Sequence, residues 1–431
     1  RAAEAKARRA ANKAARPPGK QKGDPGATLM RRVPNQTVIH APEVCSGCGA
    51  SLDDAPVVAT ATRQLLEIPD PKLEAIDHVA VRKRCACGCE TRGQFPPEAT
   101  GPVCWGPRAK ATGAYLLARQ HLPLERAGEA MADLFAAPMG EGTLAGLLVQ
   151  AEEALPQFMD RVVEALHASP VVHADETSVR VGVGLGWVHT VSSRYYTHLA
   201  VQDHWGIDGI VAIGVLGGYR GIIVHDGLAS YDCEELSGAT HAQCNQHLAR
   251  TLSDLATHRS QTPWACAMKG LLHEAREASE QAAAAGLGAV PADIAGPIRR
   301  RYDEILTQAL AWLPGDAPPP KKHTGGWTNA EREAWNLATR MRRHKEQVLR
   351  LLEDTRVPAD NNEAERSFRM CKIHDKVSGH FRSWANAEAF CTLRSYLQTG
   401  AKHGQDAMEL LVRLWTPAGA WLPSVGGPDT G

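Results

Sequence analysis

The part of the chain that most restricts its fold lies between residues 170 and 226, where short apolar runs alternate with polar breaks. Four of these runs have the composition of strands, at 171–173, 187–191, 195–201 and 221–224. An amphipathic piece at 207–216 has the composition of a helix. The segment therefore predicts a mixed α/β domain.

Three strands, a helix and a fourth strand form the opening of a ribonuclease-H-like sheet, the kind also found in retroviral integrases. We expect a fifth strand in the run that ends near Cys244. After it the sequence is helical to about Leu352, with a break at 314–326. More than a hundred residues precede the next acidic motif. That is too long for a connecting loop, so we predict an inserted helical subdomain.

Two aspartates stand where predicted apolar strands end. Asp175 follows the run that starts at Val171, and Asp226 follows the run that starts at Ile222. A carboxylate at the end of a buried strand needs a cation or several hydrogen-bond donors, so packing explains it poorly. Neighbouring strand ends would place both carboxylates within reach of shared metal ions.

A third carboxylate is expected on the helix that begins after Pro358. Asp360 suits the N-cap position, and Glu363 would then stand at N3 of a capping box, which gives Glu363 a structural role. Glu365 projects at the edge of the packed face, beside cations suited to phosphates. Glu365 is therefore the better metal ligand, with Glu363 as the alternative.

Three such carboxylates suit phosphoryl transfer with two metal ions. Ions about 3.5 to 4 Å apart activate the attacking oxygen and stabilise the leaving oxygen. Hard oxygen ligands favour Mg²⁺ or Mn²⁺ over zinc. We expect Asp175, Asp226 and Glu365 to be catalytic and to bind two Mg²⁺ or Mn²⁺ ions.

Histidines beside these positions leave a second interpretation open. Imidazole next to a strand-end aspartate also occurs in hydrolases that bind zinc or iron, so a metal-dependent phosphoester hydrolase using His173, Asp175 and His225 is an alternative. Cys244 and His247 form a CxxH pair with only two ligands in view. We favour supporting roles around the active site for His225, Cys244, His247 and Asn362.

Cysteine pairs indicate a small metal-binding module near the start of the chain. A CxxCG knuckle is followed about forty residues later by a CxCGC sequence, with short β-like runs at 57–60 and 78–81 between them. Two pairs on tight glycine turns can converge on one tetrahedral Zn²⁺. We predict a zinc-ribbon-like module with a structural Zn²⁺ held by Cys45, Cys48, Cys85 and Cys87. Cys89 is the alternative fourth ligand, and reduced structural cysteines are the alternative to zinc.

The charge balance excludes a uniformly basic, histone-like binder, because 48 Lys and Arg residues meet 48 Asp and Glu residues. The cations are nevertheless segregated. They gather in residues 1–40, at 82–84, at 340–350 and after Glu365. Residues 1–40 form either a nucleic-acid-binding arm or a solvated tail. We expect the last group to hold phosphate backbones through Arg366, Arg369, Lys372, Lys376 and Arg382.

Membrane and export signals are not apparent in the sequence. No apolar run approaches the ~18 to 20 residues that span a bilayer, so we expect a soluble protein with no membrane partner. Nothing resembles an export signal, which favours the cytoplasm. The chain starts at Arg1, and we expect its natural N-terminus to lie further upstream.

Several motifs, in this order, resemble a DDE transposase of the insertion sequence 66 family. They read HADET at 173–177, HDG at 225–227 with Ser-Tyr at 230–231, HAQCNQH at 241–247, DNNEAER at 360–366 and KVSGHFR at 376–382. A Pro/Gly-rich stretch at 17–26 and LPLER at 122–126 also resemble that family. The resemblance runs essentially the whole chain.

The resemblance implies that Asp175, Asp226 and Glu365 are the catalytic triad of a ribonuclease-H-like core with a helical insertion before the glutamate. It also implies binding to the terminal inverted repeats of a bacterial mobile element and hydrolysis at its ends. The freed 3′-OH would then attack target DNA. A homo-oligomer such as a dimer, accessory proteins from the same element and an association with the nucleoid are expected. A domesticated, inactive DNA-binding copy is the alternative.

These expectations divide the chain into six parts. They are a basic arm and linker (1–40), the zinc-ribbon-like module (41–104), a helical, helix-turn-helix-like DNA-binding segment (105–168), the first part of the core (169–262), the helical insertion (263–356) and the completion of the core with the third carboxylate (357–431).

Overall fold

The computed structural model describes residues 29–71, 73–258, 260–313 and 327–426. The chain divides into two compact units, residues 1–70 and 71–431, and each is described by itself. The expected basic arm up to residue 28 and the expected helix break at 314–326 lie outside the described residues.

The described part of the first unit has little regular structure. An isolated antiparallel bridge joins Val44 to Ser51 on either side of the first cysteine pair. The side-chain amide of Gln64 donates to the Arg32 carbonyl at 2.7 Å and accepts from its N–H at 2.8 Å. The β-like run expected at 57–60 is not a strand, and its two valines are exposed. That prediction was wrong because no strand in the described part of this unit pairs with the run.

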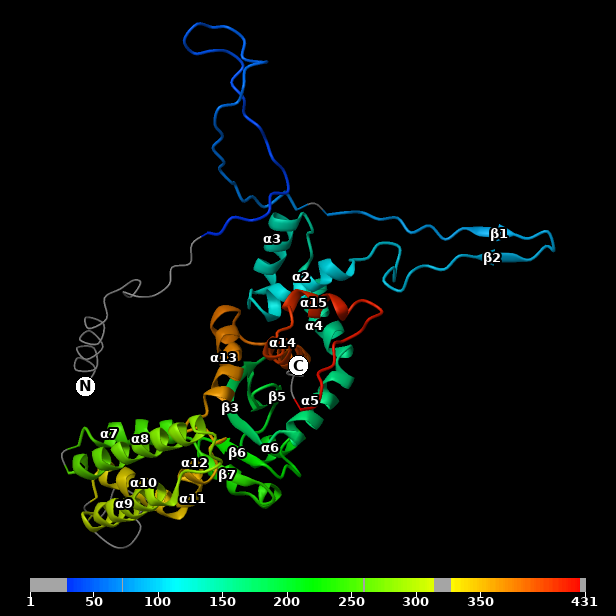
Figure 1. The fold of residues 1–431 in the computed structure, drawn as a ribbon. Helices are drawn as coiled ribbons and strands as arrows, with labels where there is room; N and C mark the ends of the chain where they lie inside the picture. The colour runs from blue at the N-terminus through cyan, green and yellow to red at the C-terminus, as the bar shows by residue number, and fades with distance from the viewer. Residues whose placement is uncertain (1–28, 72, 259, 314–326, 427–431) are drawn as a thin grey trace. The chain divides into compact units, whose positions relative to one another are not determined.

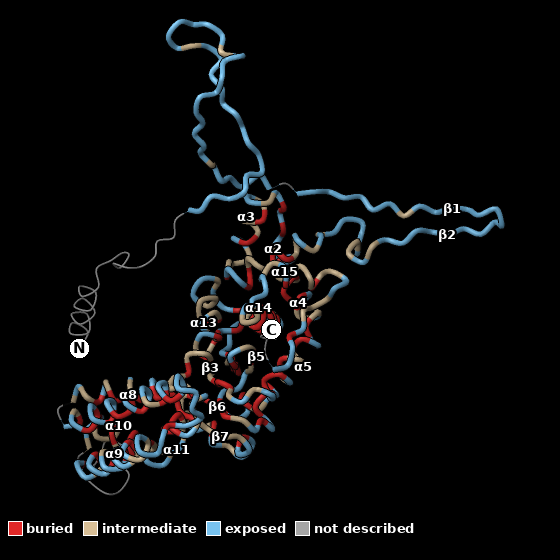
Figure 2. Tube along the Cα trace, viewed as in Figure 1, coloured by how far each residue is buried: buried red, intermediate tan, exposed pale blue. Residues whose placement is uncertain are grey.

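The second unit begins with a small hairpin of β1 (Arg82–Arg84) and β2 (Glu90–Arg92), which pair antiparallel. The run expected as a strand at 78–81 is not a strand, although its last carbonyl, at Val81, accepts from the N–H of Gly93 at 3.0 Å. The paired strand starts directly after it, because the turn between Cys85 and Cys89 sets the register. Both strands of the hairpin are exposed (Figure 2).

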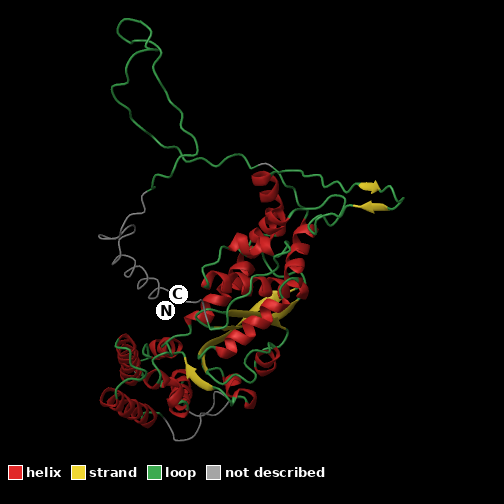
Figure 3. Ribbon diagram, turned by 45° about the vertical axis from the view of Figure 1, so that its right-hand side comes forward, coloured by secondary structure: helices red, strands yellow, loops and turns green. Residues whose placement is uncertain are grey.

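A five-stranded mixed sheet forms the centre of the second unit (Figures 1 and 3). Its strands are β3 (Val171–Val181), β4 (Gly184–Ser192), β5 (Thr197–Gln202), β6 (Ile222–His225) and β7 (Thr240–Gln243), with α6 (Ile207–Ala212) before β6. The strand order is β5-β4-β3-β6-β7. The first three strands are antiparallel neighbours, and β6 and β7 run parallel to β3. The predicted α/β core is therefore confirmed.

Helices cover one face of the sheet and share its core. They are α2 (Pro107–Ala118), α3 (Leu124–Phe135), α4 (Glu141–Glu153), α5 (Pro156–Ala168), α14 (Trp384–Lys402) and α15 (Ala407–Arg413). The apolar stripe of Leu144, Leu147 and Ala151 that marks α4 is buried here. Val172 and Ala174 from β3 lie in the same cluster, so this face of the sheet and the helices form one hydrophobic core (Figure 2).

The opposite face of the sheet packs against α13 (Asn362–Val377). Val179 and Val181 of β3 join Cys371 of α13 and Phe390 of α14 in a second cluster. Side chains alternate between the two faces of a strand, so Val172 and Ala174 point to one face, and Val179 and Val181 to the other. The odd-numbered positions of β3 therefore face α13.

The helices between β7 and α13 have a hydrophobic core of their own. They are α7 (Asn245–Leu255), α8 (Thr262–Ala284), α9 (Ala292–Ala311), α10 (Asn329–Arg343), α11 (Lys345–Val348) and α12 (Arg350–Glu353). They lie beside β6 and β7 (Figure 1), where α11 and α12 contact β7. No helix in the described ranges combines the length and the apolar character needed to cross a bilayer.

Candidate active site

Strand pairing brings Asp175 and Asp226 to neighbouring positions. In the parallel pair of β3 and β6, His173 lies opposite Val224. Asp175 comes two residues after His173, and Asp226 comes two residues after Val224. Both aspartates therefore belong to the sheet face that α13 covers. Asp175 was expected to end its strand, and that was wrong. Strand β3 continues to Val181 because β4 keeps pairing with it after β6 has ended.

Asp226 sits on a tight turn directly after β6. Its Oδ1 accepts a hydrogen bond from the N–H of Leu228 at 2.9 Å. Gly227 has a φ of 85°, a conformation that side chains other than glycine rarely adopt. A Cβ there would also approach the side-chain oxygen of Gln243 to 2.9 Å. Glycine is therefore required for the turn that presents Asp226.

The start of α13 is tied to β3 by one buried side chain. Asn361 has no exposed surface, and its amide donates to the carbonyl of Ala174 at 2.8 Å. Its side-chain oxygen lies 3.0 Å from Nδ1 of His173. The predicted capping box is wrong, because Asn361 is the N-cap and makes these contacts instead, while Asp360 accepts from the N–H of Asn362 at 3.1 Å. The contacts of Asn361 thus fix the start of α13 beside Ala174, the residue that precedes Asp175 in β3.

The two candidate glutamates of α13 have different partners. Glu363 forms an ion pair of 2.7 Å with Lys402, which also donates to the carbonyls of Ser193 and Tyr196. Glu365 lies 3.6 Å from Nε2 of His247 on α7. Glu363 therefore joins α13 to α14, whereas Glu365 is directed toward α7 and the two aspartates.

The charges around Asp175 are acidic. Burial, together with the negative charges of Asp226, Glu365 and Glu176, raises the pKa of the Asp175 carboxyl to about 7, against a lowering hydrogen bond from the N–H of Glu176. These carboxylates fit a hard divalent cation, because such a cation prefers oxygen ligands and would neutralise their negative charge. Within the described ranges, no three His, Cys, Asp or Glu side chains already form a group that could hold a metal ion.

The histidines next to the aspartates are occupied by protein contacts. Nδ1 of His225 accepts from the N–H of Gly227 at 3.1 Å, and Nε2 lies 3.3 Å from Nδ1 of His241. The ring stacks on Tyr231 with centroids 4.4 Å apart, and burial lowers its pKa to about 3. His173 is likewise engaged by Asn361. This arrangement disfavours zinc or iron binding by these two imidazoles.

Cys244 and His247 do not act as a pair. Cys244 is fully buried, and the N–H groups of Gln246 and His247 point at its sulfur, while burial raises the pKa of the thiol. The ring of His247 turns instead toward Glu365. His247 therefore lies beside the carboxylates, and Cys244 anchors the start of α7.

A comparison with models of known protein families identifies the family of this chain. Residues 102–389 match the model described as Transposase IS66 family. The chain belongs to this family. The match contains Asp175, Asp226 and Glu365, and it indicates a DNA-processing enzyme that acts as a transposase. A comparison with curated proteins found no match.

The structure of the transposase also contains side-chain contacts that the sequence did not predict. Glu176 and His189 form a buried pair, 3.2 Å apart, on the sheet face opposite Asp175. Asn361 and Lys402 determine where α13 lies. Asn361 had a signal, since it stands in the DNNEAER motif, but Lys402 had none, because its partner is far away in the sequence.

The cations predicted to hold DNA phosphates divide into free and engaged groups. Arg366, Arg369 and Lys376 are exposed on α13 of the transposase. Lys372 donates to the carbonyl of Ser178, so it joins α13 to β3. Of these four cations, Arg366, Arg369 and Lys376 are therefore the ones directly available to a phosphate backbone.

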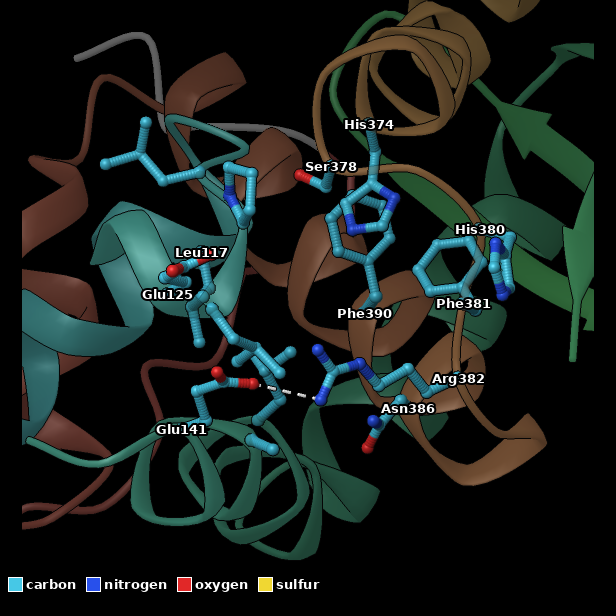
Figure 4. Close-up of a pocket in the computed structure, with 15 residues that line it drawn as sticks. Leu117, Glu125, Glu141, His374, Ser378, His380, Phe381, Arg382, Asn386 and Phe390 are labelled. Carbon is cyan, nitrogen blue, oxygen red and sulfur yellow. Dashed lines mark hydrogen bonds and ion pairs between the residues drawn. The ribbon is translucent and has the colours of Figure 1, made fainter. Parts of the chain in front are cut away.

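Arg382 lies at a pocket of about 160 Å³ between the first helices of the transposase and the turn after α13 (Figure 4). Its guanidinium forms an ion pair of 3.0 Å with Glu141 on α4. His374 stacks on Phe381 at 4.3 Å, and burial lowers the pKa of this histidine to about 4. Arg382 would have to exchange Glu141 for a phosphate in order to contact DNA.

The two cysteine knuckles each close with a backbone hydrogen bond from a glycine of positive φ, although the first turn is one residue longer and the knuckles lie in different units. In the first, the N–H of Gly49 donates to the carbonyl of Cys45 at 2.8 Å, and in the second Gly88 donates to Cys85 at 2.8 Å. Both glycines have positive φ, 75° and 87°. Since Gly49 follows Cys48 and Gly88 follows Cys87, the turns make Cys87 the counterpart of Cys48.

Proposed function

We propose that Asp175, Asp226 and Glu365 form the catalytic centre of a DNA strand-cleaving and strand-joining reaction. The observation that carries the proposal is their convergence: two neighbouring sheet positions and one helix turn contribute acids whose charges act on Asp175. Folding does not account for this arrangement, because like charges in a partly buried site destabilise the native state.

The strand order supports a ribonuclease-H-like core. Three antiparallel strands are followed by two strands parallel to the first, on its other side. In such a core, two acids stand where the parallel pairing of the strands ends, and the third stands on a helix that packs across the sheet. The helices from α7 to α12 then form the insertion that precedes the glutamate.

When bound, two Mg²⁺ or Mn²⁺ ions held by Asp175, Asp226 and Glu365 would supply the charge stabilisation that phosphoryl transfer needs. The chain's own residues position these ligands. Asn361 fixes the start of α13 against β3, and His247 holds the carboxylate of Glu365 in place. The exposed cations of α13 would bind the phosphate backbone.

The reaction that follows from this centre has two stages. Water attacks a phosphodiester at the end of the element and leaves a free 3′-OH. That hydroxyl then attacks a phosphodiester of target DNA, so one bond forms as another breaks. Terminal inverted repeats and target DNA are thus the proposed substrates. Two ends must meet, which favours a homo-oligomer, with accessory proteins of the element as further partners.

The cysteine knuckles are proposed to bind one structural Zn²⁺ through Cys45, Cys48, Cys85 and Cys87. The glycine of positive φ that follows both Cys48 and Cys87 supports the choice of Cys87 over Cys89. A closed set of four thiolates stabilises a small module and leaves no position for catalysis. We place the enzyme in the bacterial cytoplasm, on the nucleoid when it acts.

The deciding experiment incubates the protein with duplexes that carry candidate terminal repeats, with Mg²⁺, and scores nicking at the 3′ ends. Glu365→Gln should abolish nicking and leave DNA binding intact, because it removes a charged ligand and keeps the side-chain shape. Asp375→Asn, about three turns beyond Glu365 on α13, is the matched control and should nick at close to the wild-type rate. Binding by the wild type without any nicking would instead indicate an inactive DNA-binding copy.

A further inference from the structure

Strand β3 has lost one of its two neighbouring strands at the point where Asp175 stands. Its parallel pairing with β6 ends at His173, which lies opposite Val224. Of the strands in the described ranges, only β4 still pairs with β3 at Asp175 and beyond it. The orientation of Asp175 within the sheet therefore depends largely on the contacts between β3 and β4 at this level.

The residue after Asp175, Glu176, makes a buried contact with His189 of β4. The two residues lie directly opposite each other in the antiparallel register. Nδ1 of His189 lies 3.2 Å from a carboxylate oxygen of Glu176, and only 2% of the histidine side chain and 8% of the glutamate side chain are exposed. Neither carboxylate oxygen has a hydrogen-bond partner among the described residues, so this ion pair is the main interaction that offsets the burial of the charge.

Folding gives no reason for a charged pair at this position. Taking two charges out of water costs free energy, which one contact offsets only when its geometry is excellent. Apolar side chains of similar size are often as good for stability or better. On the same face of β3, Val172 and Ala174 already belong to a hydrophobic core. The pair of Glu176 and His189 therefore has a cost that packing does not explain.

The ring of His189 is held from behind by close backbone contacts. Its Nε2 lies 3.3 Å from the carbonyl of His204 and can donate a hydrogen bond to it. Gly209 of α6 comes so near that a Cβ built on it would clash with Nε2 and stand 2.5 Å from that carbonyl. Because only glycine fits there, the neighbouring backbone fixes the imidazole, and the imidazole in turn fixes the carboxylate of Glu176.

The pair acts on Asp175 through the backbone of β3. Successive side chains of a strand point to opposite faces, so a Glu176 side chain held on one face directs Asp175 toward the other, where α13 lies. The N–H of Glu176 also donates to Oδ1 of Asp175 at 2.8 Å, which selects one orientation of that carboxylate. We propose that Glu176 and His189 are positioning residues that hold the Asp175 carboxylate ready to receive a divalent cation. The inference rests on the proposed function, which gives Asp175 its role as a metal ligand.

The test measures the binding of Mn²⁺ to the full chain by electron paramagnetic resonance, which reports the free ion. Glu176→Leu combined with His189→Leu replaces the pair by apolar side chains of similar size. The urea midpoint should stay at or above that of the wild type. The dissociation constant for Mn²⁺ should nevertheless rise about tenfold, as it does when residues that orient a metal ligand are replaced. A pair that serves only stability would shift the urea midpoint and leave the affinity of the folded protein unchanged.

Three single variants complete the test. Gly209→Ala displaces the ring of His189 while both partners remain, so the Mn²⁺ affinity should also fall, by a smaller factor. Glu176→Gln should lose less affinity than the double variant, because its amide oxygen can still accept from His189. His198→Gln, at another buried histidine of the sheet, is the matched control and should bind as the wild type does.

Two results would overturn the proposal. One is wild-type affinity in the double variant, or in Gly209→Ala if the double variant does not fold. The other is an equal loss in Glu176→Gln and the double variant, because the charge of Glu176 rather than its contact with His189 would then set the affinity.

Nicking separates this proposal from the catalytic one. In the double variant, the Mn²⁺ concentration that gives half-maximal nicking should rise with the dissociation constant, and the maximal rate should change less. Asp175→Asn should lose both Mn²⁺ binding and nicking. If Asp175→Asn is inactive and the folded double variant binds Mn²⁺ normally, the positioning pair is refuted and the catalytic proposal stands. Full nicking by Asp175→Asn would refute the catalytic centre, and the positioning role with it.

Discussion

Acidic side chains have opposite surroundings in the helical insertion (α7 to α12) and at the sheet edge, by which we mean the end of the parallel pairing of β3 and β6, where Asp175 and Asp226 lie. In the insertion, Arg299 reaches Glu346 at 2.8 Å and Glu353 at 2.7 Å, and both acids are well exposed. At the sheet edge, Asp175 is partly buried and the charged side chains that act on it, Asp226 among them, are acids. The same residue type is neutralised in one region and concentrated in the other.

The difference separates what folding explains from what it does not. An exposed ion pair adds about 0 to 1 kcal/mol to the free energy of unfolding, so the insertion depends little on any one of its pairs. Acids gathered in a partly buried site lower that free energy. Their presence at the sheet edge is therefore a sign of function, and their removal should affect activity more than folding.

The largest expected effect is on catalysis. Asp226→Asn keeps the shape of the side chain but removes one charge, so nicking should fall by about 10³-fold, equivalent to the several kcal/mol that metal-assisted charge stabilisation supplies. The free energy of unfolding, measured with urea, should stay equal or rise because repulsion with Asp175 is relieved. Asp303→Asn in the insertion is the control for both measurements. Nicking at the wild-type rate would remove Asp226 from the centre.

A smaller effect is expected at the ion pair that places α13. Lys402→Met removes the cation that pairs with Glu363 and that donates to the carbonyl of Ser193. The urea midpoint should fall by the equivalent of about 3 kcal/mol, as for other buried pairs that lose one partner. Adding Glu363→Gln should restore part of the loss. A full loss that the second substitution does not change would mean that Lys402 acts through packing alone.

Acidification should weaken the sheet by a comparable but smaller amount. Burial lowers the pKa of His198 on β5 from 6.5 to about 4. Between these values the unfolded chain binds a proton that the folded chain does not, so stability falls as the pH drops. From pH 7 to pH 5 this histidine accounts for about 2 kcal/mol. His198→Gln should flatten the dependence of the melting temperature on pH, and the exposed His273→Gln should not.

The smallest effect belongs to the insertion. Arg299→Gln removes two ion pairs, yet the free energy of unfolding should change by less than about 1 kcal/mol, and less at high salt. Thermal unfolding at two salt concentrations measures it. A loss as large as that of Lys402→Met would erase the contrast between the two regions.

The sequence predicted those features that arise from short-range patterns. Runs of β-branched residues marked the strands, and helical spacing marked α4, because each signal is contained in a few turns or a few residues of chain. The proximity of Asp175 to Asp226 followed from the same logic, since parallel neighbours align their corresponding positions. The choice of Glu365 over Glu363 used only the geometry of one helix.

Features that depend on distant partners could not be predicted in this way. The length of β3 depends on β4, and within the described residues the run at 57–60 has no partner strand and the run at 78–81 makes only the hydrogen bond from Gly93 to the Val81 carbonyl. The expected cap at Asp360 lost to contacts of Asn361 with β3. The partner of Glu363 lies on another helix. In each case a tertiary contact overrode a local preference.

The hydrogen bond between Asn245 and Ala359 has an evolutionary consequence. The chain leaves the sheet and returns to it at one point, so the helices after α7 form a detour, whereas α7 itself carries His247, which contacts Glu365. Loop-closure entropy grows only logarithmically, by about 0.6 kcal/mol for each doubling of length. Insertions or deletions in this detour during evolution should therefore cost the fold little and leave the three carboxylates in register.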